Sequence, residues 1–124
     1  MFPSFSSITS RRIHIALVGC GRISRNHIKA IALNYERAVL VAFCDPIAER
    51  LEMAQQLLAD TLPPHQLETV AARHFSSCSE LLEAVKANSL KVDLVVLTTP
   101  SGLHASQVIA VAELGLHVCT EKPM

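Results

Sequence analysis

The chain has 124 residues, half of them apolar, and its 11 Lys and Arg balance 11 Asp and Glu. This length predicts one domain with a buried core, and the apolar content argues against disorder. The balanced charge argues against a nucleic-acid-binding or polybasic membrane-binding surface, and no apolar run approaches the roughly 18–20 residues of a membrane span.

Two features bear on the cellular compartment. Residues 1–12 are predicted to be a flexible leader, because they lack the basic start and unbroken apolar stretch of a secretory signal. The cysteines form no C-x-x-C pair; they are Cys20, Cys44, Cys78 and Cys119. We therefore expect a cytoplasmic protein with reduced thiols, without disulfides or a metal site.

Apolar runs and amphipathic stretches alternate along the remainder, residues 13–124. Strands are predicted at Ile13–Val18, Val39–Cys44, Arg73–Phe75, Val92–Leu97 and Leu116–Cys119. Four helices are predicted. The first spans Arg22–Asn34, and the second has an apolar face formed by Ile47, Leu51, Ala54 and Leu58. The third follows the capping box Ser77–Glu80, and the fourth ends at Leu114 and Gly115. Strands that are apolar throughout and joined by helices form parallel sheets covered on both faces. The sequence therefore predicts an α/β fold, a doubly wound parallel sheet (Rossmann) of about five strands.

A glycine-rich loop follows the first predicted strand, with the sequence Gly19-Cys20-Gly21-Arg22-Ile23-Ser24. Glycine permits a tight turn with positive φ, and a second glycine lets backbone amides approach a pyrophosphate. The N-terminus of the next helix offers unpaired N–H groups to the anion. The third fingerprint position is usually Gly or Ala, and Ser24 departs from that pattern. The loop predicts a dinucleotide site, with a purely structural turn as the alternative.

Asp45 ends the second predicted strand, 24 residues after Gly21, near the spacing at which an acidic residue meets an adenosine ribose. A carboxylate there accepts bonds from ribose hydroxyls and repels a 2′-phosphate, which favours NAD(H) over NADP(H). Arg50 is the nearby cation that could reverse the preference, but its place between Glu49 and Glu52 indicates a solvated helix residue. A turn-forming Asp before Pro46 is the plainer alternative.

A methyltransferase that binds S-adenosylmethionine is a further alternative, since it also shows a glycine loop and an acidic second strand. Those enzymes usually carry an acidic residue just before the first glycine, where this chain has Leu17 and Val18. The dinucleotide interpretation is therefore preferred.

Three motifs together point to one family: residues 19–27 (GCGRISRNH), residues 99–104 (TPSGLH) and residues 121–124 (EKPM). Residues 12–124 resemble the nucleotide-binding half of the Gfo/Idh/MocA oxidoreductases. Within that family, the chain is most similar to bacterial UDP-N-acetyl-amino-sugar 3-dehydrogenases and those of the corresponding uronic acid.

The resemblance implies the cofactor NAD and a set of site residues. Gly19, Gly21, Arg22 and Ile23 would border the pyrophosphate, and Asp45 would hold the adenosine ribose. Thr99, Pro100, Ser101 and His104 would line the nicotinamide side, with Glu121 and Lys122 beneath the ring. Lys122 would be the catalytic residue, because an ammonium near a substrate hydroxyl stabilises the developing alkoxide or relays its proton.

Each of these roles has a plainer alternative. Lys122 can be a solvated lysine, Ser101 an N-cap, and His104 a residue of the first helical turn. His27 is predicted to be a core histidine on the face of Ile23 and Ile31, not a ligand. Cys20 is interpreted as filler in the loop and not as a nucleophile.

The family's enzymes continue into a second domain that supplies substrate contacts, an acid/base residue and the main oligomer interface. The resemblance therefore implies that residues 13–124 are an incomplete enzyme whose full-length form is a homo-oligomer acting on a nucleotide sugar or a sugar. We expect the chain alone to bind NAD weakly, to turn over no substrate and to leave adhesive apolar faces. A stand-alone nucleotide-binding or redox-sensing module remains the other class of function.

Overall fold

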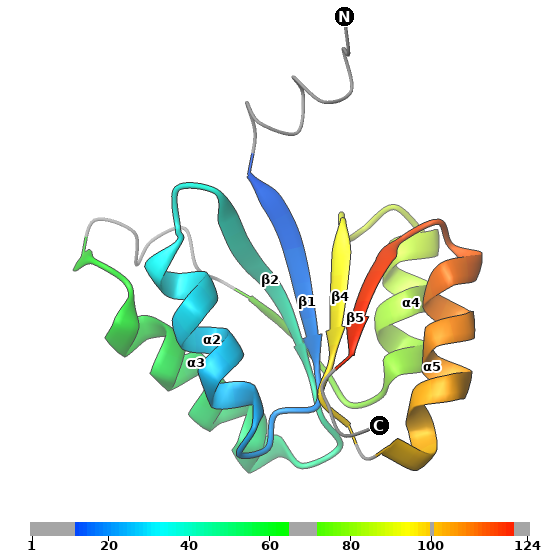
Figure 1. Cartoon of the computed structure of the whole chain (residues 1–124), viewed down its shortest axis with the longest axis horizontal. Coiled ribbons are helices and arrows are strands. Elements are labelled where there is room, and N and C mark those ends of the chain that lie inside the picture. Colours follow the sequence, from blue (N-terminus) through cyan, green and yellow to red (C-terminus); the bar gives the residue numbers. More distant parts are fainter. Residues whose placement is uncertain (1–11, 65–71, 100, 121–124) are drawn as a thin grey trace, which may run out of the picture.

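A parallel five-stranded sheet forms the centre of the structure, a computed structural model that describes residues 12–64, 72–99 and 101–120, without the side chains of residues 101–104 (Figure 1). The elements in chain order are β1 (Ile13–Val18), α2 (Ser24–Leu33), β2 (Ala38–Cys44), α3 (Ala48–Thr61), β3 (Arg73–Phe75), α4 (Cys78–Lys86), β4 (Leu94–Leu97), α5 (Ser101–Glu113) and β5 (His117–Thr120). Each strand is followed by a helix up to β5, as the alternating pattern predicts.

The strand order is β3-β2-β1-β4-β5, and every neighbouring pair is parallel. The chain therefore leaves β1 toward one edge of the sheet and returns through β4 toward the other. This doubly wound arrangement confirms the predicted fold class. Ligands of such sheets bind outside the carboxyl ends of the strands, at the point where the order reverses. Here that point lies between β1 and β4.

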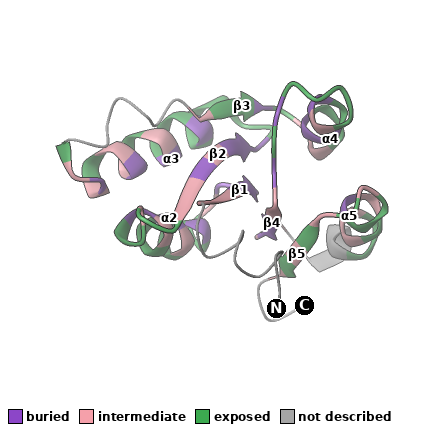
Figure 2. Cartoon of the chain, turned by 90° about the horizontal axis from the view of Figure 1, so that it is seen from above, coloured by how far each residue is buried: buried purple, intermediate pink, exposed green. Residues whose placement is uncertain are grey.

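Helices cover both faces of the sheet. Helices α2 and α3 lie on one face and α4 and α5 on the other (Figures 1 and 2). Two core clusters correspond to these layers. One joins Leu17 and Phe43 to Ile28 of α2 and Leu58 of α3, and the other is built around Leu97 and its neighbours. The buried side chains of β1, β2 and β4 are apolar on both faces, because these strands lie between the two helix layers.

Two local expectations need correction. Ile47 does not join the buried face of Leu51, Ala54 and Leu58, because it lies at the N-cap of α3 and is 44% exposed. Ile23, predicted to share an inward face with His27, is 48% exposed for the same reason: it precedes the first residue of α2.

The predicted caps at Ser77 and Gly115 are confirmed, whereas α2 is shorter than the predicted Arg22–Asn34 helix. The Ser77 hydroxyl accepts a hydrogen bond from the Glu80 N–H at 3.2 Å, as an N-cap should. The Glu80 carboxylate accepts from the N–H of Ser76, one residue earlier than the capping-box pattern places it. Gly115 has φ +76°, the left-handed conformation expected of a glycine after a helix. No helix within the described ranges is long and apolar enough to cross a membrane.

Candidate cofactor-binding site

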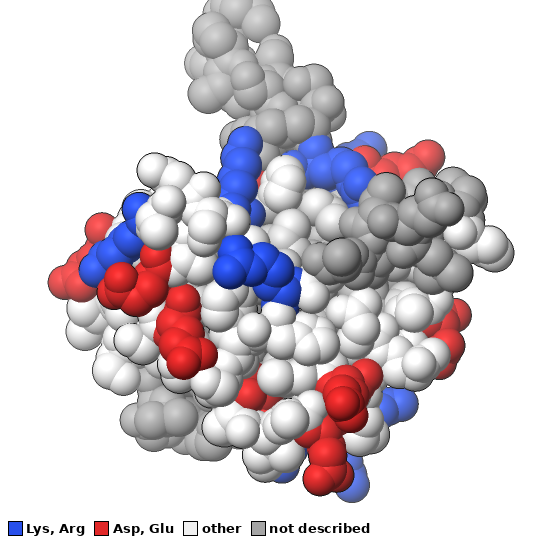
Figure 3. All heavy atoms as spheres, turned by 180° about the vertical axis from the view of Figure 1, so that it is seen from behind, with Lys and Arg blue, Asp and Glu red and all other residues white. Residues whose placement is uncertain are grey.

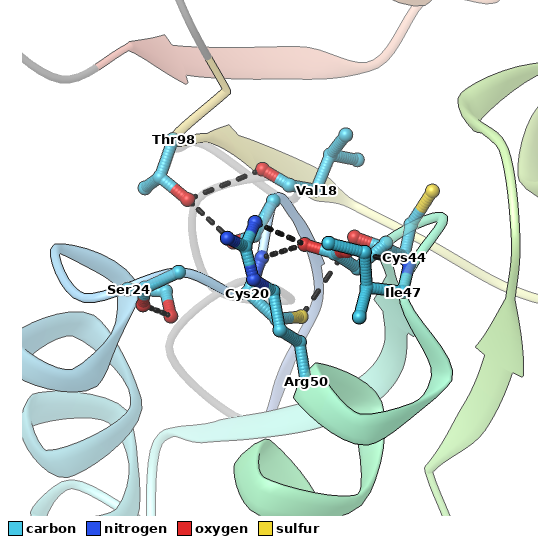
Figure 4. Close-up of polar contacts among 10 residues, drawn as sticks. Val18, Cys20, Ser24, Cys44, Ile47, Arg50 and Thr98 are labelled. Carbon is cyan, nitrogen blue, oxygen red and sulfur yellow. Dashed lines mark hydrogen bonds and ion pairs between the residues drawn. The ribbon is translucent and has the colours of Figure 1, made fainter.

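The carboxyl ends of three strands meet at one edge of the sheet, where Figure 4 shows Val18, Cys44 and Thr98 close together. Gly19 continues from β1, Asp45 from β2 and Thr98 from β4. The N–H of Gly19 donates to the carbonyl of Cys44 at 2.7 Å, and the N–H of Thr98 donates to the carbonyl of Val18 at 2.9 Å. The strand ends are therefore held in fixed register around the loop.

Gly19 adopts a conformation that other residues avoid. Its φ is +93°, and a Cβ there would lie 2.9 Å from both the Thr98 carbonyl carbon and the Thr99 nitrogen. Real Cβ atoms do not come that close to backbone. The predicted requirement for glycine at this turn is confirmed by the positive φ, and the crowding by Thr98 and Thr99 adds a second reason.

Gly21 has a different role. It has no positive φ, and the nearest atom to a Cβ built there is Nη1 of Arg50, at 4.0 Å. Nothing in the fold of the described residues therefore demands glycine at this position. The open space beside it is what the approach of a pyrophosphate to the backbone requires.

Ser24 fits the place usually held by Gly or Ala. It is 1% exposed, and its hydroxyl donates to the carbonyl of Gly21 at 2.6 Å. The hydroxyl is thus satisfied within the turn, and the helix still packs against the sheet. The departure from the fingerprint does not disturb the loop.

The N-terminus of α2 is suited to binding an anion. The helix has no side-chain cap and no acidic residue in its first turn. Within the described part of the chain, the backbone N–H groups of Gly21, Arg22 and Ile23 donate no hydrogen bond. Unpaired N–H groups at a helix start, together with the helix dipole, suit a phosphate. These residues would hold the pyrophosphate of a dinucleotide.

Asp45 lies beside this loop, and its side chain is buried. Its side chain is 3% exposed; Oδ2 accepts the N–H of Cys20 at 2.9 Å and Oδ1 accepts the N–H of Ile47 at 2.8 Å. The carboxylate therefore connects the loop after β1 with the start of α3. A carboxylate has about four lone-pair positions, so two backbone bonds leave capacity for ribose hydroxyls.

Thr98 contacts the glycine loop, which the sequence analysis did not predict. Its hydroxyl donates to the Gly19 carbonyl at 2.5 Å and lies 3.3 Å from the Val18 carbonyl (Figure 4). The predicted residue, Thr99, instead bonds through its hydroxyl to Oε1 of Gln107 in α5 at 2.6 Å. A polar residue directly after the central strand β4 was the available signal for Thr98.

The interpretation of Arg50 as a solvated helix residue is incomplete. Its side chain is 51% exposed, but Nη1 lies 3.8 Å from Oδ2 of Asp45 (Figure 4). It also lines a cavity of about 440 Å³ between α2 and α3, together with Arg22 and Arg25. Figure 3, which views the molecule from behind, shows both basic and acidic side chains on that face.

The environment of the two cysteines near the site keeps their thiols protonated and therefore unreactive. Burial, then the nearby Asp45 carboxylate, raises the pKa of Cys20 to about 12. Burial is also the main reason that the pKa of Cys44 rises to about 12. A thiol at these pKa values is protonated near neutral pH, which supports the interpretation of Cys20 as filler.

Several predicted site residues cannot be placed. Pro100, Glu121 and Lys122 lie outside the described residues, as do the side chains of Ser101 and His104. His27 is half-buried. Among the residues that are described, no group of three or more His, Cys, Asp and Glu side chains could hold a metal ion.

Comparison with known proteins agrees with this geometry. The model of the oxidoreductase family with an NAD-binding Rossmann fold (Gfo/Idh/MocA) matches residues 13–124. The chain belongs to this family. The resemblance drawn from the three motifs is thereby confirmed, and NAD, the predicted cofactor, is the one that the family description names. Membership favours an oxidoreductase over the methyltransferase alternative.

Individual relatives cover nearly the whole chain. Inositol 2-dehydrogenase 4 of Saccharopolyspora erythraea is 32% identical over 117 residues, 94% of this chain and 30% of the relative. A WlbA dehydrogenase from Bordetella pertussis, solved with NADH and UDP-GlcNAcA, is 46% identical with a TM-score of 0.72, over 92% of this chain and 30% of that one. The scyllo-inositol dehydrogenase of Lactobacillus casei, solved with NAD(H) and scyllo-inositol, is 26% identical with a TM-score of 0.71, over 91% of this chain and 28% of that one. The chain thus spans about 30% of the length of these relatives.

Proposed function

We propose that this chain is the NAD(H)-binding part of a dehydrogenase that moves a hydride between the nicotinamide and a hydroxyl-bearing carbon of a nucleotide sugar. The observation that carries the proposal is the position of Asp45, whose carboxylate accepts the N–H of Cys20 at 2.9 Å and so lies beside the glycine loop. The proposed phosphate cradle and the proposed ribose acceptor therefore lie side by side, which would suit a single dinucleotide.

The chain's residues would divide the work by position. Gly19 fixes the turn, while Gly21, Arg22 and Ile23 present backbone N–H groups to the pyrophosphate. Asp45 would accept the ribose hydroxyls. Thr99, Pro100, Ser101 and His104 would border the nicotinamide side, with Glu121 and Lys122 beneath the ring. Bound NAD would supply the hydride acceptor. Lys122 would hold the substrate hydroxyl and take part in its proton transfer.

The nucleotide-sugar substrate is the finer part of the proposal. It is supported by the 46% identity to a WlbA dehydrogenase solved with UDP-GlcNAcA, a higher identity than to the inositol dehydrogenases described above. Sugar contacts, the remaining acid/base residue and the homo-oligomer interface would come from a second domain of the complete enzyme. The 124-residue chain alone is expected to bind NADH and to oxidise no UDP-N-acetylglucosaminuronate.

The test is titration of the purified chain with NADH, followed by the cofactor's own fluorescence, which is convenient because the protein has no Trp. Asp45→Ala should weaken binding about tenfold or more, since hydrogen bonds to a charged group contribute about 1.5–3 kcal/mol. Asp60→Ala is the matched control, because Asp60 is exposed at the far end of α3 and bonds only to Gln56 within the described residues.

Far-UV circular dichroism and urea unfolding would verify that the Asp45 variant keeps its fold. Unchanged NADH affinity in a folded Asp45→Ala protein would refute the ribose assignment. Saturable binding of S-adenosylmethionine without binding of NADH would instead restore the methyltransferase hypothesis.

A further inference from the structure

The Thr98 hydroxyl, just after β4, holds the backbone of the glycine loop that follows β1. It donates to the Gly19 carbonyl at 2.5 Å (Figure 4), and the N–H of Thr98 donates to the Val18 carbonyl at 2.9 Å. Gly19 is buried, and among the described residues its carbonyl accepts no hydrogen bond except that of the hydroxyl. A buried carbonyl without a partner is costly, so Thr98 supplies a bond that the loop needs.

The other side of the same peptide is held by Asp45. The peptide that joins Gly19 to Cys20 has its carbonyl bonded to Thr98, and its N–H donates to Oδ2 of Asp45 at 2.9 Å. In a trans peptide the C=O and N–H bonds point in opposite directions. Because β1 lies between β2 and β4, the carboxylate and the hydroxyl reach this peptide from opposite sides of the strand. Its plane is therefore fixed by two side chains.

Without these bonds the peptide would be free to rotate. Gly19 has φ +93°, and glycine has the widest choice of backbone conformations. Half a turn of the peptide would exchange the directions of its C=O and N–H and break both hydrogen bonds. The backbone N–H groups of Gly21, Arg22 and Ile23 follow shortly after, and within the described residues they donate no hydrogen bond. The direction of these N–H groups therefore depends on the peptide that leads into the loop.

We propose that Thr98 is a positioning residue for the dinucleotide. With the Asp45 carboxylate, its hydroxyl locks the Gly19–Cys20 peptide, so that the N–H groups at the start of α2 face the pyrophosphate before the cofactor arrives. This inference rests on the proposed function. A loop that already has its binding conformation loses less conformational freedom on binding and so binds more tightly. Thr98 acts through the loop and not by contact with the cofactor.

The test removes the hydroxyl and measures the affinities for NADH, ADP and adenosine by calorimetric titration of the chain. Thr98→Ala should weaken NADH and ADP about threefold to tenfold, the effect of one hydrogen bond. Thr98→Ser restores the hydroxyl and should return both to within about twofold of the unmodified protein. Adenosine, which lacks the pyrophosphate, should change by less than about twofold in either variant.

Thr61→Ala is the matched control. The Thr61 hydroxyl also donates to a backbone carbonyl, that of Leu57 at 2.8 Å, but it lies at the last residue of α3, far from the loop. Its loss should leave all three affinities unchanged. Urea unfolding shows whether each variant is folded under the titration conditions. If Thr98→Ala does not fold, Thr98→Val replaces it, because valine keeps the branched shape without the donor.

The remaining outcomes separate this inference from the proposed function. Unchanged NADH or ADP affinity in a folded protein without the hydroxyl would overturn the role of Thr98. An equal loss for ADP and adenosine, or no recovery in Thr98→Ser, would also overturn it, because either result would indicate a general structural role. Absence of NADH and ADP binding by the unmodified chain would instead refute the proposed function, and the role of Thr98 with it.

Discussion

Gly19 and Gly21 stand two residues apart, but the structure distinguishes their roles. Gly19 has a φ of +93°, and a Cβ added to it would lie 2.9 Å from backbone atoms of Thr98 and Thr99. Gly21 has neither restriction. We expect Gly19→Ala to lower the free energy of unfolding by about 1–3 kcal/mol, the usual cost of a strained backbone conformation. The measurement is urea unfolding followed by circular dichroism.

Gly21→Ala is the matched control for this prediction. Because its nearest neighbour is the flexible end of Arg50 at 4.0 Å, this variant should change stability little and lose NADH affinity instead. Equal destabilisation of both variants would contradict the separation of a folding glycine from a binding glycine.

The residue types of the loop could be predicted from sequence, but their partners could not. Gly19 was identifiable because a buried strand ends there and a helix follows. Thr98, 79 positions away, forms its bond to Gly19 only because β4 lies next to β1 in the sheet. Arg50 is exposed as predicted, but its contact with Asp45 was missed for a related reason. Its neighbours in sequence are acidic and exposed, while its neighbour in space is the buried carboxylate of Asp45.

Among the elements, α4 shows most clearly how a local signal fixes a helix start. Ser77 has extended backbone, and its hydroxyl accepts the Glu80 N–H at 3.2 Å. Ser77→Ala should therefore lower the free energy of unfolding by about 1 kcal/mol, the usual effect of losing an N-cap. Ser79→Ala, at an exposed position two residues later in the same helix, should cost much less.

Urea unfolding of the two serine variants side by side would check this prediction, and a Ser79 effect as large as that of Ser77 would refute the capping role.

Glu80 shows what the capping-box motif does not predict, namely which backbone N–H its carboxylate accepts. Its carboxylate bonds to the N–H and hydroxyl of Ser76, so the polar residue before the cap competes with the cap's own N–H. A pattern of residue types does not decide between two such neighbours.

At the scale of the whole molecule, the alternation of apolar strands and helices was sufficient for the fold class. Strands buried on both faces need a layer of helices on each side, and a chain of this length has room for one such sheet. The strand order, and the point at which that order reverses, depend on which strands pair with each other over long distances in sequence. They determine the site, because placing β1 between β2 and β4 brings the ends of these three strands together.

The two buried thiols near the site belong to opposite sides of the sheet. Cys20 is part of the core beneath α2 and α3, and Cys44 is part of the core beneath α4 and α5. Their pKa values rise from 9.0 to about 12 in the folded protein, mainly by burial. An acid whose pKa is raised by folding stabilises the native state below its unfolded pKa, and this contribution disappears as the pH rises toward the folded pKa.

The free energy of unfolding should therefore decline steadily as the pH increases from about 9 toward 12. Cys20→Ala should make the decline shallower, since it removes one proton that the unfolded chain releases and the folded chain keeps. Cys119→Ala, at an exposed position on β5, is the control substitution. Urea unfolding across this pH range measures all three proteins, and an identical slope for Cys20→Ala and the unmodified chain would show that Cys20 ionises freely in the native state.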